Sequence, residues 1–395
     1  MSWLIRGARV IAGDGSPAQA DCDVAIEGER ITAIGRSLVL APGQRLLEAR
    51  GRVLMPGFVD AHTHALFAGD RLDEFEARQR GASYQEILKA GGGIFSTVRA
   101  VRAASAEELE AGLLERLERM LLEGTTTLEV KSGYGLTTAH ELKMLRVIAA
   151  AARRFAGTLV PTALLGHALD PELPDLVDQV VTETLPAVSR DFPGVFVDAY
   201  CEDGAWSLAS CRRLFVAAQA LGHPLRVHAD QFQRLGAVDL ALELGARSVD
   251  HLEASSADDL ARIARSRTIA VMLPASGFHL DDRYADARAL LDAGGSLVLA
   301  TNCNPGSSPT SSMPLVIALA VRKLRLGVLE CITATTRAPA LLLGLPDRGV
   351  VSAGARADLI LLRHRDERAL GYELGGNPVD VVFAGGKLVT RAEAG

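Results

Sequence analysis

The middle of the chain repeats one unit, an amphipathic helix followed directly by an apolar strand. In one such unit Ser105 precedes Glu108 by three residues, as in a capping box, and apolar residues at helical spacing lead to Gly124. Helices of this kind are predicted at 105–124, 139–153, 208–221, 237–244, 257–264 and 285–291. Strands are predicted at 53–60, 125–130, 159–165, 195–200, 225–228, 248–251, 269–273 and 297–301. About eight strands that alternate with helices predict an α/β fold with parallel strands, closed as a (β/α)8 TIM barrel.

The two ends of the chain have a different pattern, short strands separated by turn residues. The N-terminal strands are predicted at 3–11, 23–27, 30–34 and 45–48, and the C-terminal ones at 357–362, 379–383 and 387–390. Two β-rich ends that flank an α/β middle predict a small composite β-sandwich built from 1–55 and 346–395. The barrel, with the catalytic residues, is then expected to span 56–345.

Composition excludes several classes of protein. The 395 residues have a formal net charge of -6 and contain no block of lysine or arginine, so nucleic acid is not expected as a partner. No uncharged apolar run is long enough to cross a membrane, and the N-terminus does not resemble a signal peptide. The five cysteines are scattered, which is typical of free thiols in a reducing compartment. We therefore expect a cytoplasmic enzyme.

Histidines gather where the predicted strands end, although the strand interiors are expected to be apolar. His62 and His64 follow a buried strand and a Pro-Gly pair, and their i, i+2 spacing on an extended segment puts both imidazoles on one face. His167, His228 and His251 end later strands. Active sites of parallel barrels lie at these strand ends, and neighbouring imidazoles can share one divalent metal ion. The alternative, a pair of surface histidines after a buried strand, does not explain the further histidines downstream.

Several motifs carry a resemblance to a known family. PGFVDAHTH at 56–64, with the later His228-Ala229-Asp230, resembles the metal-dependent amidohydrolase superfamily. Within it the chain is similar to the imidazolonepropionases, which hydrolyse 4-imidazolone-5-propanoate to N-formimidoyl-L-glutamate in histidine degradation. The more specific matches are GGGI at 91–94, EVKSGYGL at 129–136, GHA at 166–168 and NPGSSP at 304–309.

The resemblance implies a barrel of the amidohydrolase type with a composite sandwich, a homodimer, and one zinc or iron ion (Zn²⁺, Fe²⁺ or Fe³⁺) in each subunit. Carried over position by position, the metal ligands are His62, His64, His228 and Asn302. The residues implied in catalysis are His251, Asn302 and Gln231. Those implied in binding the anionic imidazolone substrate are Arg71, Tyr84, Tyr134, His167, Gln231, His251, Asn304, Gly306 and Ser307.

These residue types suit hydrolysis of a cyclic amide. A bound divalent metal lowers the pKa of water toward neutrality, and His251 can move protons in the same pH range. Arg71 can hold the substrate propionate with a two-pronged contact, and Tyr84 and Tyr134 add hydroxyl donors. The alternative for Arg71 is a surface arginine that pairs with a neighbouring aspartate, Asp70 or Asp73.

Two positions depart from the family pattern. The family usually has aspartate where this chain has Asn302, and some relatives have glutamate where it has Gln231. Neither amide is basic, so proton transfer is expected to fall to His251, with Glu129, Glu202 and Glu253 as nearby carboxylates. The departures leave room for two alternatives, an amidohydrolase acting on another small heterocycle, and a relative that binds metal or ligand without catalysis.

Overall fold

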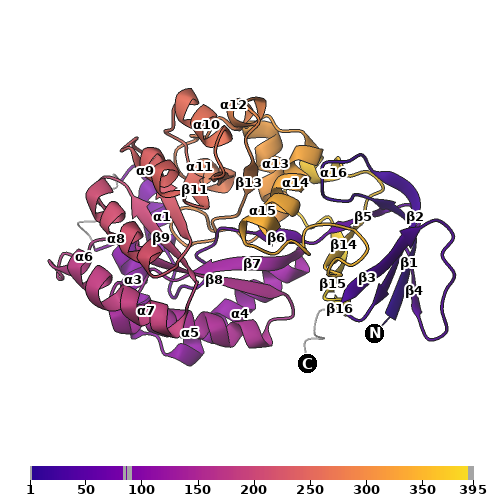
Figure 1. Cartoon of the computed structure of the whole chain (residues 1–395), viewed down its shortest axis with the longest axis horizontal. Coiled ribbons are helices and arrows are strands. Elements are labelled where there is room, and N and C mark those ends of the chain that lie inside the picture. The colour runs from indigo at the N-terminus through magenta and orange to yellow at the C-terminus, as the bar shows by residue number, and fades with distance from the viewer. Residues whose placement is uncertain (1, 83–85, 87–90, 390–395) are drawn as a thin grey trace.

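The computed structural model describes residues 2–82, 86 and 91–389, and within them one sheet forms a barrel (Figure 1). Its eight strands are parallel and lie side by side in chain order. They are β6 (Phe58–Asp60), β7 (Thr125–Lys131), β8 (Thr158–Gly166), β9 (Phe196–Cys201), β10 (Leu225–Ala229), β11 (Ser248–His251), β12 (Ile269–Met272) and β13 (Leu297–Leu299). Backbone hydrogen bonds of 3.0 Å, from Asn302 to His62 and from His64 to Cys303, join the ends of the first and last strands. The prediction of a (β/α)8 barrel is confirmed.

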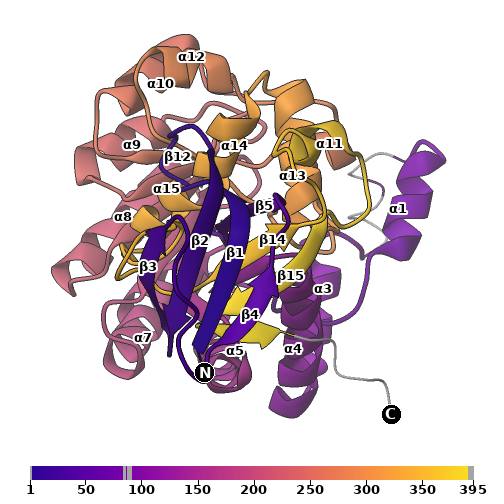
Figure 2. The same cartoon turned by 90° about the vertical axis from the view of Figure 1, so that its right-hand side faces the viewer.

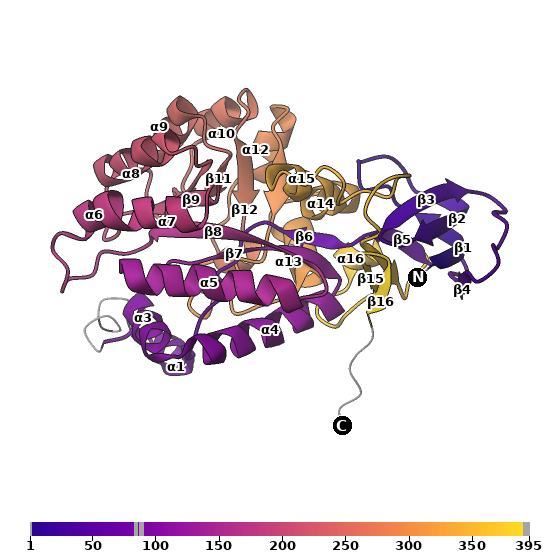
Figure 3. The same ribbon diagram turned by 60° about the horizontal axis from the view of Figure 1, so that its bottom comes forward.

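Helices cover the outside of this barrel (Figure 3). In α4 the predicted capping box is present, since the Ser105 hydroxyl accepts from the Glu108 N–H and the Glu108 carboxylate accepts from the Ser105 N–H. The helices are α1 (Leu72–Gln79), α3 (Ile94–Ala103), α4 (Ala106–Leu122), α5 (Thr138–Arg154), α6 (Leu176–Gln179), the π-helix η1 (Val180–Thr184), α7 (Leu185–Asp191), α8 (Leu208–Ala220), α9 (Ala237–Leu244), α10 (Ala257–Ala264), α11 (Pro274–Leu280), α12 (Ala287–Asp292), α13 (Met313–Lys323), α14 (Val328–Thr335), α15 (Arg337–Leu342) and α16 (Ala369–Tyr372).

A second, mixed sheet combines strands from both ends of the chain, as predicted (Figure 2). Its strands are β1 (Ser2–Val10), β2 (Gln19–Glu27), β3 (Arg30–Gly35), β4 (Arg45–Glu48), β5 (Val53–Pro56), β14 (Leu359–Leu362), β15 (Val379–Ala384) and β16 (Lys387–Val389). The strand order is β16-β15-β14-β5-β1-β2-β3, and β4 pairs with β1. The N-terminal and C-terminal parts meet where β5 runs antiparallel to β14.

The strands at this junction are buried on both faces. Met55 of β5 and Ile360 of β14 belong to the core that fills the barrel and its helices. Their neighbours Leu54, Leu359 and Leu361 point the other way, into a separate core within the composite sheet. This two-residue alternation places apolar side chains on both sides, so the composite sheet packs directly on the barrel.

The segment 53–60 is predicted as one strand, and this is wrong. It forms β5 of the composite sheet and β6 of the barrel, with Gly57 between them. A Cβ atom at Gly57 would lie 2.3 Å from Thr126 Oγ1 of β7, so the close approach of the two strands requires glycine here. The domain boundaries at 55/56 and 345/346 stay a prediction.

Among the described residues, no helix is both long and apolar enough to cross a membrane.

Candidate metal and active site

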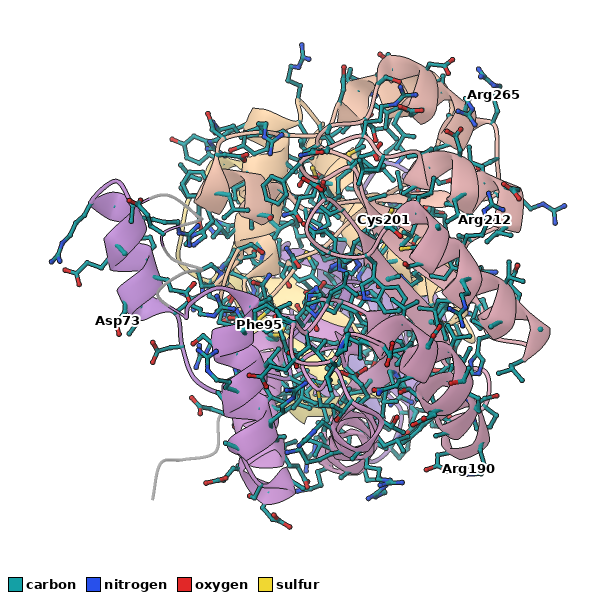
Figure 4. The ribbon with its side chains drawn as sticks, turned by 90° about the vertical axis from the view of Figure 1, so that its left-hand side faces the viewer. Asp73, Phe95, Arg190, Cys201, Arg212 and Arg265 are labelled. Carbon is teal, nitrogen blue, oxygen red and sulfur yellow. The ribbon has the colours of Figure 1, made fainter. Side chains whose placement is uncertain are left out.

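Three histidines lie together where barrel strands end. His62 and His64 follow β6, and His228 lies in β10. All three are buried. Because β6 starts at the composite sheet, its far end lies on the opposite side of the barrel, which Figure 4 faces. There α1, with Asp73, stands at the edge of the molecule, and Phe95 of α3 lies nearer the centre.

The ring nitrogens of these histidines converge. One nitrogen from each of His62, His64 and His228 lies within 4.8 Å of the others, and the Nε2 atoms of His64 and His228 are 3.2 Å apart. His62 Nε2 is buried and has no hydrogen-bond partner among the described residues. Three convergent imidazole nitrogens, one of them buried without a partner, fit the ligand set of a divalent metal ion.

Carboxylates behind two of these rings orient them. Asp250 Oδ2 lies 2.6 Å from His62 Nδ1, and Asp198 Oδ1 lies 3.1 Å from His228 Nδ1. A neutral imidazole carries one proton, and a carboxylate can only accept it. We infer that each ring donates from Nδ1 and keeps the Nε2 lone pair for a metal ion.

Burial keeps the three histidines neutral. It lowers the pKa of His62 and of His64 well below the ordinary value for histidine. For His228, burial also lowers the pKa, although the neighbouring Asp198 carboxylate acts in the opposite direction. Only a neutral imidazole has a lone pair for a metal ion, so all three are in the binding form at neutral pH.

Asn302 lies beside this group. Its backbone has φ = 54°, a left-handed conformation that asparagine adopts more readily than most residues, and its N–H donates to the His62 carbonyl. Its side-chain Oδ1 is buried without a hydrogen-bond partner among the described residues. This oxygen is a neutral donor atom, and the backbone hydrogen bond to His62 keeps Asn302 next to a predicted ligand.

His251, the predicted proton carrier, also faces the group. Its ring centre lies 5.9 Å from that of His62 and 5.5 Å from that of His228. His251 Nδ1 is 3.3 Å from a carboxylate oxygen of Glu253. The backbone of His251 has φ = 88°, a strained value for a residue with a side chain, of the kind found at functional sites.

His167 and Tyr134 form one wall of the site. His167 stacks on His64 with ring centres 5.1 Å apart, and Tyr134 lies 5.1 Å from His167. Burial lowers the pKa of His167 to about 3, so its ring is neutral. The Glu141 carboxylate accepts N–H groups of residues 133, 135 and 136, which fixes the loop that carries Tyr134.

The 304–309 loop forms another wall, beside Arg71. Asn304 Oδ1 accepts the N–H groups of Gly306 and Ser307 at 2.9 and 2.7 Å, so the Asn304 side chain organises its own loop. A Cβ on Gly306 would lie 3.9 Å from Arg71 Nη1. The Arg71 side chain is only 8% exposed and pairs with Glu74 at 2.7 Å. It is therefore not the surface arginine paired with an aspartate that the alternative described.

Two further predicted substrate contacts have different outcomes. Gln231 accepts a hydrogen bond of 3.0 Å from the Tyr200 hydroxyl, and the Tyr200 ring lies 5.9 Å from that of His228. Gln231 is thus joined to the histidine group through Tyr200. Tyr84 lies outside the described residues.

The chain is similar to known proteins over most of its length. A sequence model of the Amidohydrolase family matches residues 71–385. The imidazolonepropionase of Herpetosiphon aurantiacus is 46% identical over 383 residues, covering 93% of this chain and 90% of the relative. That of Rubrobacter xylanophilus is 45% identical, with 93% and 90% covered. The chain belongs to the amidohydrolase family, among the imidazolonepropionases.

Solved structures of other amidohydrolases share the fold of this imidazolonepropionase family member. N-isopropylammelide isopropylaminohydrolase from Burkholderia multivorans aligns with a TM-score of 0.74 at 20% identity, over 98% of both chains. A mutant atrazine chlorohydrolase from Arthrobacter aurescens, complexed with zinc and atraton, aligns with a TM-score of 0.72 at 20% identity, over 98% of this chain and 94% of its own. At this identity the likeness concerns the fold alone.

The imidazolonepropionase barrel also contains buried charged residues that are not among the predicted metal ligands or substrate contacts. The expectation that strand interiors are apolar is wrong, because barrel strands carry completely buried ionisable side chains, and five of these, from four strands, form one group. They pair with one another, which makes their burial tolerable. The only signal in the sequence is an ionisable residue inside an otherwise apolar strand. These residues are Glu129, Lys131, Asp198, Arg226 and Asp250.

Proposed function

We propose that this chain hydrolyses the ring C–N bond of 4-imidazolone-5-propanoate to give N-formimidoyl-L-glutamate, a step of histidine degradation. The observation that carries the proposal is the convergence of three buried histidine nitrogens within 4.8 Å, at the strand ends of a barrel. Relatives named imidazolonepropionase are 42–46% identical to the chain over most of its length. Asn302 and Gln231 carry neutral amides, but the three convergent histidines and the similarity to these relatives are present all the same.

The metal in this proposal is one zinc or iron ion in each subunit. His62, His64 and His228 would hold it through ring nitrogens, with Asn302 Oδ1 as a further donor atom. When bound, such an ion polarises the amide carbonyl and lowers the pKa of water, so that hydroxide is available near neutral pH.

His251 is the proposed proton carrier. It accepts the proton of the attacking water at Nε2, while Nδ1 faces Glu253 at 3.3 Å. It then returns that proton to the ring nitrogen that leaves, which completes the cleavage of the C–N bond. Asn302 and Gln231 carry neutral amides and cannot accept a proton in this way, so they are proposed to orient the reactants.

The walls of the site supply the proposed substrate contacts. Arg71 binds the propionate, because its side chain lies beside the 304–309 loop and its guanidinium can make paired contacts with a carboxylate. Tyr134 and His167 line the wall beside His64 and are proposed to face the imidazolone ring. The remaining proposed contacts are Tyr84, Gln231, Asn304, Gly306 and Ser307.

The deciding experiment is to follow consumption of 4-imidazolone-5-propanoate by metal-replete protein, beside a chelated sample and a blank without protein. We expect chelator-sensitive turnover to N-formimidoyl-L-glutamate. Metal-bound protein with no turnover above the blank would contradict the proposal. It would favour another ring substrate, or a protein that binds without catalysis. The metal itself is identified by elemental analysis of protein purified without added metal.

We also propose that the chain forms a homodimer, as the family resemblance implies. Size-exclusion chromatography with light scattering tests this directly. A mass near twice 41.8 kDa is expected, and a mass equal to one chain at micromolar concentration would overturn it.

A further inference from the structure

The proposed metal ligands carry no negative charge. His62, His64 and His228 are neutral imidazoles, and Asn302 is a neutral amide. A divalent cation that leaves water for a buried site needs compensating negative charge nearby. In this structure the negative charge lies behind two of the histidine rings, on the side of their Nδ1 atoms.

Two buried aspartates touch the ligands from behind. Asp250 Oδ2 lies 2.6 Å from Nδ1 of His62, and Asp198 Oδ1 lies 3.1 Å from Nδ1 of His228. Both aspartates are completely buried. Each therefore acts on a metal ion through one imidazole ring, with little screening by solvent.

The buried ion pairs around these aspartates leave an excess of negative charge. Lys131 Nζ lies 2.8 Å from both Glu129 and Asp198. Arg226 lies 2.6 Å from Asp250 and 3.3 Å from Glu129. Among these described residues three carboxylates face two cations, so one negative charge is left over when all five are ionised. The ion pairs with Lys131 and Arg226 fix the positions of these carboxylates.

We propose that Asp250 and Asp198 are positioning residues that supply the metal site with the negative charge missing from its ligands. They do so while holding the ring protons of His62 and His228 on Nδ1. This inference rests on the proposed metal site. It also explains why no carboxylate is needed at Asn302, since Asp250 and Asp198 supply negative charge from the other side of the histidine rings.

The test measures zinc affinity by competition with a coloured chelator, using the full chain. We expect Asp250→Asn and Asp198→Asn each to weaken zinc binding about 10- to 100-fold. The matched control is Asp259→Asn, since Asp259 is an equally buried aspartate that pairs with Arg234, outside the barrel interior. Its zinc affinity should match that of the unmutated protein. Zinc affinities of both site variants within twofold of the unmutated protein would overturn the inference.

A second background separates charge supply from ring orientation alone. Asn302→Asp restores a carboxylate on the ligand side, so in that background Asp250→Asn should cost clearly less affinity than in the unmutated chain. An equal loss in both backgrounds would overturn the charge role. If Asp250→Asn does not fold, as judged by circular dichroism, the comparison is made with Asp198→Asn. Unmutated protein that binds neither zinc nor iron would instead contradict the proposed function, so the two failures are distinguishable.

Discussion

His62 is restrained both at its ring and at its backbone. Asp250 holds Nδ1 at 2.6 Å, and the backbone carbonyl of His62 accepts the N–H of Asn302 at 3.0 Å. Only Nε2 is left to bind a ligand. Because two of the three histidines are held in this way by aspartates, the site is largely preorganised, and the loss of one ring cannot be made up by movement of the others.

His228→Ala is therefore expected to abolish tight metal binding. The two remaining nitrogens and the neutral amide of Asn302 are too few ligands for a stable zinc or iron site. Metal content per chain after dialysis is the measurement, with His364→Ala as the control. His364 pairs with Glu373 and is partly exposed. Metal content near that of the unmutated chain would remove His228 from the ligand set.

For Asn302 we expect a substitution that keeps or improves activity. Asn302→Asp should preserve or raise kcat/KM, because aspartate also tolerates φ = 54° and adds a charged oxygen that can accept a proton. Steady-state kinetics of metal-loaded protein measure this. If the activity fell by tenfold or more, the amide Nδ2, which lies 3.4 Å from Ser307 Oγ, would have a role that a carboxylate cannot fill.

Arg71→Ala should raise KM more than it lowers kcat. In the proposed role the guanidinium binds the propionate equally in ground state and transition state, and a charge-assisted contact of this kind corresponds to about a 10- to 100-fold change in KM. Glu74→Gln should give a smaller rise, because Arg71 keeps its hydrogen bond of 2.9 Å to Thr97 Oγ1. An unchanged KM for Arg71→Ala would exclude it from substrate binding.

Among the elements, the passage from β5 to β6 is tightly constrained. The chain leaves one sheet and enters the other across the single residue Gly57, against Thr126 of β7. The segment that follows β6 carries His62 and His64, so an error in this passage would shift two of the proposed metal ligands.

Gly57→Ala is expected to lower the free energy of unfolding by about 1–3 kcal/mol, as overpacking does in a rigid core. Thr126→Ala should recover part of the loss in the double variant, because it removes the Oγ1 and Cγ2 atoms nearest to the added methyl group. Gly112→Ala is the matched control. Gly112 lies inside α4 with nothing closer than 3.6 Å, so this substitution should be neutral or slightly stabilising. Denaturant unfolding measures all four proteins.

The elements also show where sequence patterns stop being informative. The capping box and one-sided apolar stripe of α4 predict that helix almost to the residue. By contrast α13 is buried on nearly all sides, so it has no polar face and no helical period to detect. For the site, too, the sequence patterns are informative only in part. Polar strand ends reveal His62, His228 and their neighbours, but Asp198 and Asp250 gain their role only through partners distant in sequence.

For the whole molecule, the two cores are not independent. β5 and β14 contribute alternate side chains to each of them, so neither the barrel nor the composite sheet can unfold without exposing apolar surface of the other. We therefore expect one cooperative unfolding transition.

Calorimetry with and without chelator tests this expectation. Metal at about 100 times its Kd should add about 2.7 kcal/mol and shift the single transition to higher temperature as a unit. Two transitions, of which only one responded to metal, would show that the composite sheet is a separately folding domain.

The pairing of β5 with β14 has a consequence for how the chain is made. Pro56 pairs with Leu359, which leaves the ribosome some 300 residues later. At about 5–20 residues per second, that interval is on the order of 15–60 seconds. During this time β5 has an open edge, of the kind that pairs with foreign strands and leads to aggregation. The nascent chain therefore needs protection at its N-terminal strands until its last forty residues have been synthesised.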